Sequence, residues 1–228
     1  MAYEKRLGVF AHLPKTGVHA GADTARLTPP LGPGEASRMY TAFLCDLLSR
    51  LTALKKTRVT VFYDGGDPAS LAELMPKNCQ KEPQRGVSVG ERLQAAFSSL
   101  LQGTNGTAVI IGSDSPDLPI RYLKRAFLKL KHNDVVIGPA SGGGYYLIGL
   151  KSPAPALFDG IDWRGARALG ETVERVDACG LSLSLLPLWY RVDSPSSLFL
   201  LSEMILARRI EKSLRLQATE AELKSMKR

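Results

Sequence analysis

The segment 107–119, TAVIIGSDSPDLP, contains residues whose types and spacing suit chemistry: two aspartates and two serines directly after an apolar run. Carboxylates are protein ligands that Mg²⁺ or Mn²⁺ prefers, and one or two suffice where the ion also binds phosphate. Asp114 is the candidate metal ligand, and Gly112 beside it would let a ligand approach the backbone closely. The alternative is that Asp114 and Asp117 only cap a turn and the following helix.

A further aspartate and a basic loop could complete such a site. Asp193 stands where a predicted strand ends and a helix begins, so it could share an ion with Asp114 or act as an ordinary helix cap. The long loop 12–34 carries Lys15, Arg26 and several glycines, which suit anion binding. Metal ions and cations stabilise the charge that develops during phosphoryl chemistry. This pattern points to chemistry on a nucleoside diphosphate or triphosphate.

Other common catalytic motifs do not occur in the sequence. There is no GxxxxGK[ST] phosphate loop, and the glycines at 142–144 lack the GxGxxG spacing of a dinucleotide site. The three histidines fall in unrelated places, and no Ser-His-Asp order is suggested. The three cysteines are far apart and lack metal spacing, which predicts a reducing, cytoplasmic setting without disulfides.

Alternating strands and helices must position these residues. Apolar and β-branched runs predict strands at 7–11, 58–63, 77–83, 108–111, 134–139, 145–150 and within 181–190. Helical periodicity predicts helices beginning at Glu35 and at 69–74, 89–101, 119–131, 164–178 and from Pro195 onward. The uninterrupted run 108–111 suits a strand buried on both faces of a parallel sheet, and ligands bind at the carboxyl ends of such strands. The runs 134–139 and 145–150, joined by a glycine turn, predict an antiparallel insertion.

Residues 1–206 are interpreted as a single α/β domain, and residues 207–228 as a basic C-terminal helix or tail. The net charge is +8, and the tail holds seven basic and three acidic residues. No nucleic-acid motif accompanies this basic stretch, so we favour a solvated helix end, with nucleic-acid association as a weaker alternative. No segment reaches the ~18 apolar residues that a membrane span requires.

Several motifs occur in one order between about Phe10 and Leu201: LTPPLGPGEA, MYTAFLCD, GERL, IGSDSPDLP, GPA followed by GGYYLIGL, LFDGIDW and VDSPSSL. In this combination the chain closely resembles the DUF2064 group, proteins assigned as glycosyltransferases of the rSAM/selenodomain-associated transferase type. The resemblance implies a three-layer α/β/α, GT-A-like nucleotide-diphospho-sugar transferase fold with a mostly parallel mixed sheet. It also implies kinship with the molybdenum-cofactor and phospholactate nucleotidyltransferases.

The resemblance implies roles for individual residues. Asp114 and Asp193 match the aspartates expected to hold the metal, and Arg26 matches the arginine of the family's phosphate loop. Asp114 and Arg26 are therefore the expected catalytic residues. Contacts to nucleotide or phosphate are expected from Leu13, Lys15, Arg26, Gln84, Gly90, Arg92, Gly112 and Ser113. The acceptor side is expected at Gly143, Gly144, Tyr145 and Trp163.

Polar positions in four family motifs differ in this chain. Thr24 and Ala25 stand where the family's phosphate loop has lysine and threonine. Ser88 and Gly142 each replace the aspartate of the family motifs DLGER and DGGYY, and Arg164 replaces the serine of WST. The scaffold glycines, prolines and apolar runs are kept while these polar groups are replaced.

We therefore expect a cytoplasmic transferase that uses Mg²⁺ or Mn²⁺ and a nucleotide-activated small-molecule donor, with a nucleotide sugar as the leading donor. One alternative is nucleotidyl transfer from a nucleoside triphosphate with release of pyrophosphate. Another is a degenerate, non-catalytic nucleotide-binding homologue, which the four altered motifs favour. A homo-oligomer is left open.

Overall fold

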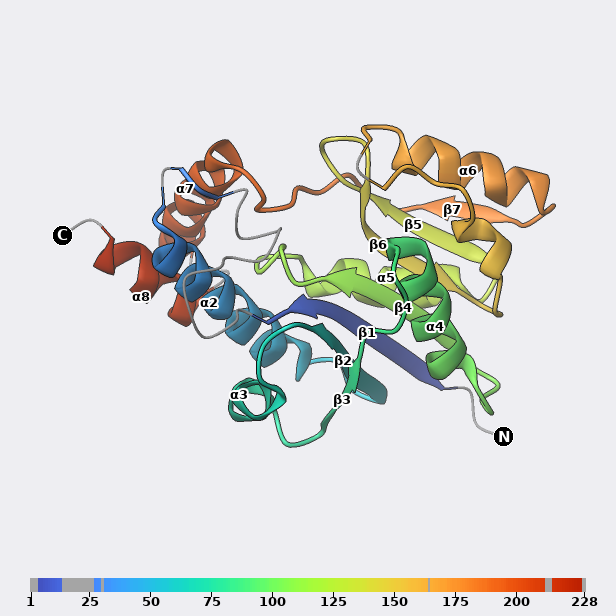
Figure 1. Cartoon of the computed structure of the whole chain (residues 1–228), viewed down its shortest axis with the longest axis horizontal. Coiled ribbons are helices and arrows are strands. Elements are labelled where there is room, and N and C mark those ends of the chain that lie inside the picture. The colour runs from blue at the N-terminus through green and yellow to red at the C-terminus, as the bar shows by residue number, and fades with distance from the viewer. Residues whose placement is uncertain (1–3, 14–26, 30, 164, 212–214, 227–228) are drawn as a thin grey trace.

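Seven strands form one mixed sheet through the middle of the molecule (Figure 1). The structure is a computed structural model that describes residues 4–13, 27–29, 31–163, 165–211 and 215–226. The strand order is β3-β2-β1-β4-β6-β5-β7; β6 is antiparallel to β4 and β5, and the other pairs are parallel. The strands are β1 (Lys5–His12), β2 (Thr57–Asp64), β3 (Cys79–Pro83), β4 (Thr107–Gly112), β5 (Val135–Pro139), β6 (Tyr145–Leu150) and β7 (Leu183–Leu185).

Helices cover both faces of this sheet. One core is formed with α2 (Pro33–Leu51), α3 (Pro68–Leu74) and α5 (Ile120–Lys129), and the opposite core with α4 (Val89–Leu101), η1 (Pro155–Phe158) and α6 (Ala168–Ala178). Successive strand residues face opposite sides, so β4 sends Val109 to the first core and Ile110 to the second. A strand buried on both faces must be apolar throughout, which explains its uninterrupted run. The expected three-layer α/β/α architecture is confirmed.

The C-terminal helices α7 (Pro195–Glu211) and α8 (Gln217–Ser225) pack with α2 in a third apolar core, at the end of the molecule away from α6 (Figure 1). Asp46 of α2 accepts hydrogen bonds from the backbone N–H groups of Ala218 and Thr219 at 3.1 and 2.8 Å, which caps the start of α8. The proposed boundary at residue 207 falls inside α7. Within the described ranges, no helix has the length and apolar character needed to cross a bilayer.

The bounds of most predicted elements lie within two residues of the observed bounds, and the antiparallel pair β5–β6 is confirmed. The strand expected within 181–190 is confirmed as the short β7, which is followed by an isolated bridge between Ala140 and Trp189, since Pro187 has no N–H to continue a ladder. One helix prediction was too long. Helix α6 begins at Ala168 and not at 164, because Gly165 donates back to the Asp162 carbonyl in a turn.

The carboxyl ends of β1 and β4 lie side by side where the strand order reverses, since β2 and β3 extend the sheet on one side of β1 and β4 on the other. The backbone N–H of Leu13 donates to the Asp64 carbonyl at 2.8 Å, and that of Ser113 to the Phe10 carbonyl at 3.1 Å. The segments after β1, β2 and β4 therefore meet at one edge. Open α/β sheets bind their ligands in the crevice at such a switch point.

Candidate functional site

Asp114 lies in the loop that leaves β4 at this switch point. A Cβ atom added to Gly112 would lie 2.7 Å from Oδ1 of Asp114, closer than real contacts allow. The carboxylate thus occupies the space that a side chain at residue 112 would fill. A side chain at residue 112 would displace this carboxylate, so Gly112 leaves room for Asp114 in its observed position.

Asp114 and Asp193, which the sequence offered as a possible pair, both face Arg191. Arg191 Nε donates to Asp114 Oδ2 at 2.6 Å, and Arg191 Nη2 lies 3.7 Å from Asp193 Oδ2. The side chains of Asp114, Arg191 and Asp193 are 18%, 29% and 30% exposed, so solvent reaches all three. The arrangement is a carboxylate pair that shares one guanidinium.

This donor set suits a hard divalent cation in chemical kind, because it offers two carboxylates that solvent reaches, and phosphate oxygens of a ligand could complete the coordination. In the part of the chain that the structure describes, no group of three or more His, Cys, Asp or Glu side chains is placed to hold a metal ion. A metal at this site would therefore depend on Asp114, Asp193 and oxygens from its substrate. It would also meet the positive charge of Arg191.

The remainder of the 113–118 loop is anchored and buried. The hydroxyl of Ser113 is hydrogen-bonded to that of Tyr40, which also accepts from the His12 backbone N–H at 3.0 Å. Ser115 donates to the Tyr190 carbonyl at 2.9 Å. Ser113 and Ser115 are each 2% exposed, so the structure places Ser113 as an anchor of the loop, with its hydroxyl turned away from solvent.

Capping of a turn or helix was one alternative for Asp117. Its side chain instead forms a buried ion pair. Its Oδ2 accepts from Arg208 Nη1 and from the Tyr190 hydroxyl, each at 2.7 Å, and its Oδ1 from Trp189 Nε1 at 3.4 Å. Arg50 Nη2 donates to the Leu118 carbonyl at 2.7 Å. Arg208 belongs to the stretch interpreted as a solvated helix end; its side chain is mostly buried, so that interpretation is wrong for this residue.

A second polar cluster lies at the carboxyl ends of β1 and β2. Arg92 Nη1 donates to Asp64 Oδ2 at 2.7 Å and lies 3.5 Å from Gln84 Oε1, while His12 Nδ1 is 3.8 Å from the same Asp64 oxygen. Gln84 Nε2 donates to the carbonyls of Ala11 and Phe62 at 3.3 and 3.0 Å. Gln84 and Arg92, both predicted nucleotide contacts, are thus neighbours. Leu13 lies beside them, 4% exposed.

Lys15 and Arg26 fall outside the described residues, so the predicted phosphate loop has no structural account here. Helix α4 begins at Val89 as predicted, and the Ser88 hydroxyl caps it by accepting from the Glu91 backbone N–H at 3.1 Å. The Glu91 carboxylate accepts from the N–H of Val87, one residue before the cap, whereas in a capping box it would accept from the N–H of the cap residue itself.

Gly90, Tyr145 and Trp163 come together in an aromatic packing cluster. A Cβ at Gly90 would lie 2.6 Å from the Phe158 carbonyl oxygen and 3.2 Å from Trp163 Nε1. Tyr145 packs edge-on against Trp163 with ring centroids 6.0 Å apart. The structure therefore explains Gly90 by close packing of α4 against η1, and it gives Tyr145 and Trp163 a shared packing role.

The glycine turn between β5 and β6 divides into two roles. Gly143 has φ +88°, and a Cβ there would lie 1.7 Å from the Ala166 carbonyl oxygen, so only glycine allows the 165–169 segment to pass. Its carbonyl accepts from the Leu169 N–H at 2.9 Å. Gly144 faces the site, because the nearest atom to a Cβ there is Arg191 Nη1 at 3.8 Å.

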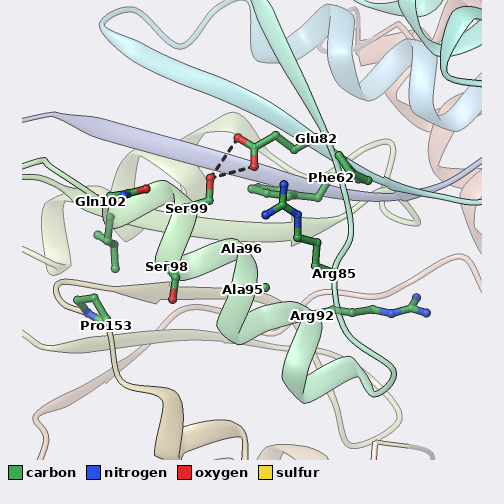
Figure 2. A pocket seen from close by; sticks show the side chains of 12 residues that line it. Phe62, Glu82, Arg85, Arg92, Ala95, Ala96, Ser98, Ser99, Gln102 and Pro153 are labelled. Atoms are coloured by element: carbon green, nitrogen blue, oxygen red, sulfur yellow. Dashed lines mark hydrogen bonds between the residues drawn. The ribbon is translucent and has the colours of Figure 1, made fainter.

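A separate hollow of about 670 Å³ runs along the outer side of α4, between β3 and Pro153 (Figure 2). Glu82 accepts from the Ser99 hydroxyl at 2.9 Å inside it. Arg92 belongs to its lining, but the guanidinium points away from Ser98 and Ser99 (Figure 2). Asp114 and Arg191 do not line this hollow.

Sequence reasoning missed Arg191, Asp64 and His12. Arg191 stands two residues before Asp193, and a cation so close to a candidate ligand was an available signal. Asp64 ends β2 much as Asp114 follows β4, in the polar run DGGD, and His12 ends β1. Each is a chemically capable residue at a strand's carboxyl end, and only the sheet order shows which ends are neighbours.

The family model DUF2064, described as an uncharacterized protein conserved in bacteria, matches residues 47–165. No curated protein matches the chain. Among solved structures, a candidate nucleotide-diphospho-sugar transferase from Desulfovibrio desulfuricans G20 is 30% identical, with a TM-score of 0.83 over 98% of this chain and 95% of that chain.

Two more distant structures share the architecture. The 4-diphosphocytidyl-2C-methyl-D-erythritol synthase from Anaerococcus prevotii DSM 20548 has a TM-score of 0.57 at 8% identity, over 89% of this chain and 99% of that chain. The CMP:2-keto-3-deoxy-manno-octonic acid synthetase in complex with CTP has a TM-score of 0.52 at 11% identity, over 90% and 100%. At such identities the likeness shows the fold alone.

Proposed function

This chain belongs to the DUF2064 family, and from that membership we propose that it is a transferase that binds a nucleotide-activated donor, with a nucleotide sugar as the leading candidate. The donor would lie in the crevice at the carboxyl ends of β1 and β4. The observation that carries the proposal is the Asp114 carboxylate, solvent-accessible at that switch point and held against a cationic group.

The two polar clusters suggest how a nucleotide would be divided along the edge. The group of Gln84, Arg92, Asp64 and His12 offers hydrogen-bond donors and acceptors of both charges, which suits a base and ribose. The group of Asp114, Arg191 and Asp193 lies by the glycine turn and would face the phosphates, where Arg191 can donate two parallel hydrogen bonds to phosphate oxygens. Positioning and charge stabilisation are the main contributions that such chemistry needs from a protein.

A divalent metal is part of this proposal. Asp114 and Asp193 would hold Mg²⁺ or Mn²⁺, and the ion would stabilise charge on the phosphate oxygens of the leaving group. The residues of the chain would orient the donor: Asp114 is kept in place by the room at Gly112 and by the Val192 N–H, which donates to its carbonyl at 2.7 Å.

Nucleotidyl transfer from a nucleoside triphosphate is the second candidate. It is favoured by the two distant structures, which are both named as synthases or synthetases of cytidylyl compounds, one of them bound to CTP. The two reactions share a scaffold and differ in the bond broken. Release of a nucleoside diphosphate identifies sugar transfer, whereas release of inorganic pyrophosphate identifies nucleotidyl transfer.

The test is a binding and turnover panel on the full chain. Nucleoside diphosphates, nucleoside-diphosphate sugars and nucleoside triphosphates are titrated calorimetrically with and without Mg²⁺. Release of a nucleoside diphosphate or of inorganic pyrophosphate is then assayed, with water as the acceptor. We expect one nucleotide class to bind in a Mg²⁺-dependent manner. Asp114→Asn should weaken that binding by about tenfold or more, equal to ~1.4 kcal/mol.

Asp177→Asn is the matched control, because Asp177 is an exposed aspartate at the end of α6, and it should leave nucleotide binding unchanged. No binding of any nucleotide would overturn the proposal. Tight binding that ignores both Mg²⁺ and Asp114→Asn would indicate a non-catalytic nucleotide-binding protein instead.

A further inference from the structure

We propose that Arg191 is an internal cation that excludes free divalent metal from the Asp114–Asp193 pair until a phosphate-bearing ligand draws the guanidinium away. The inference deepens the proposed function, since it says how metal and donor would be coupled at that site. Arg191 is thereby assigned as a positioning residue whose side chain has two places to bind: the carboxylate pair, or the phosphate.

The contacts of Arg191 support the first place. Its Nε hydrogen bond to Asp114 Oδ2, at 2.6 Å, is in the short range of charge-assisted bonds, and its Nη2 lies 3.7 Å from Asp193 Oδ2. One guanidinium therefore faces one oxygen of each aspartate. A metal ion that bound these two oxygens would lie close to the guanidinium, so the two cations compete for them.

The charges of these three side chains support the exclusion of free divalent metal. The two carboxylates and the Arg191 guanidinium together carry one net negative charge. A divalent ion entering beside Arg191 would be attracted by the carboxylates and repelled by the guanidinium at short range. A bound phosphate adds negative charge and accepts hydrogen bonds from arginine, so it favours both the metal and the departure of Arg191 from the carboxylates.

The backbone around Arg191 is held in place, so the side chain is the part that can change position. The Val192 N–H donates to the Asp114 carbonyl at 2.7 Å, and the Tyr190 carbonyl accepts from the Ser115 hydroxyl at 2.9 Å. On its other side the guanidinium faces Gly144, where an added Cβ would lie 3.8 Å from Arg191 Nη1. A change of partner would therefore involve the Arg191 side chain, with the loop backbone kept in place.

The experiment measures binding of Mn²⁺ alone to the full chain, by electron paramagnetic resonance of the free ion. The wild type should bind Mn²⁺ at least ~10-fold more weakly than Arg191→Gln, in which the competing charge is removed. Adding Asp114→Asn to Arg191→Gln should abolish the gain. Arg191→Met should reproduce the gain and serves in place of Arg191→Gln if that variant does not fold.

Arg167→Gln is the matched control, because Arg167 forms an exposed ion pair with Glu174 at 2.9 Å, and its loss changes the net charge equally. It should leave Mn²⁺ affinity unchanged. The inference is overturned if the wild type and Arg191→Gln bind Mn²⁺ equally, if neither binds it, or if Arg167→Gln has the same effect. No nucleotide is needed, so failure here is distinguishable from failure of the nucleotide panel.

Discussion

Asp114 and Asp117 lie three residues apart in one loop, and each is paired with an arginine from the C-terminal part of the chain. Asp114 keeps 18% of its side chain exposed and faces Arg191, which is itself 29% exposed. Asp117 is 0% exposed, its Arg208 partner is 13% exposed, and Tyr190 and Trp189 supply two more donors. Solvent reaches one carboxylate, while the other is enclosed and accepts three hydrogen bonds from the protein.

Asp117 therefore holds the loop in place, and Asp114 in the same loop stays accessible to solvent. Asp117 connects the loop to α7 through Arg208, and Arg50 of α2 binds the carbonyls of Pro116 and Leu118. These contacts restrain the backbone that follows Asp114, as Gly112 and Ser113 restrain the backbone that precedes it. A binding group needs such rigid support to keep its geometry.

The largest loss of unfolding free energy is expected from Asp117→Ala. The substitution leaves the buried Arg208 guanidinium without its charged partner, and breaking a buried ion pair costs about 3–5 kcal/mol. Urea unfolding followed by circular dichroism measures the loss of unfolding free energy. A loss below about 1 kcal/mol would contradict the division between the two aspartates, because such a value belongs to an exposed pair.

An intermediate effect is expected from Tyr190→Phe. It removes one hydrogen bond to a buried carboxylate, which contributes about 1.5–3 kcal/mol near neutral pH. The same variant tests a pH dependence. Burial, and next the Asp117 charge, raise the pKa of Tyr190 above its ordinary value.

The raised pKa of Tyr190 sets the direction in which stability changes with pH. The unfolded chain ionises this tyrosine near pH ~10 while the folded protein does not, so its contribution is fully present below that pH and is lost as the pH rises further. Urea midpoints between pH 8 and 11 should fall less steeply for Tyr190→Phe than for the wild type. Parallel curves would contradict a pKa of Tyr190 that folding raises.

The smallest effect on stability is expected from Asp114→Ala. Solvent-accessible ion pairs contribute about 0–1 kcal/mol, so the unfolding free energy should change by no more than that. The same urea titration used for Asp117→Ala provides the comparison. If Asp114→Ala unfolds the protein as readily as Asp117→Ala, then Asp114 is a structural residue and the site proposed around it fails.

The local pattern of the sequence was sufficient for most of the architecture. The period of the apolar residues placed α4 at Val89–Leu101 and β6 at Tyr145–Leu150 as observed, and the DUF2064 motifs indicated the three-layer fold. Backbone periodicity and turn residues are properties of short segments, so they can be read without knowing what lies elsewhere. The alternation within 181–190 predicted that a strand lies there but not its bounds, because Pro187 and the sheet edge decide where pairing stops.

The division of roles among site residues was decided by tertiary structure alone. Asp114 and Asp117 are the same residue type in the same loop, and the position of Arg208, some ninety residues later, makes one of them structural. Gly112 was expected to admit a ligand to the backbone and Gly90 to contact the nucleotide, but at each position an atom of the protein lies close to where a Cβ would be. Burial and partnership depend on segments far apart in the chain, and they determine whether a carboxylate is available to a ligand. Residue types showed which side chains are able to bind or react. The packing showed which of them solvent reaches and which charges they face.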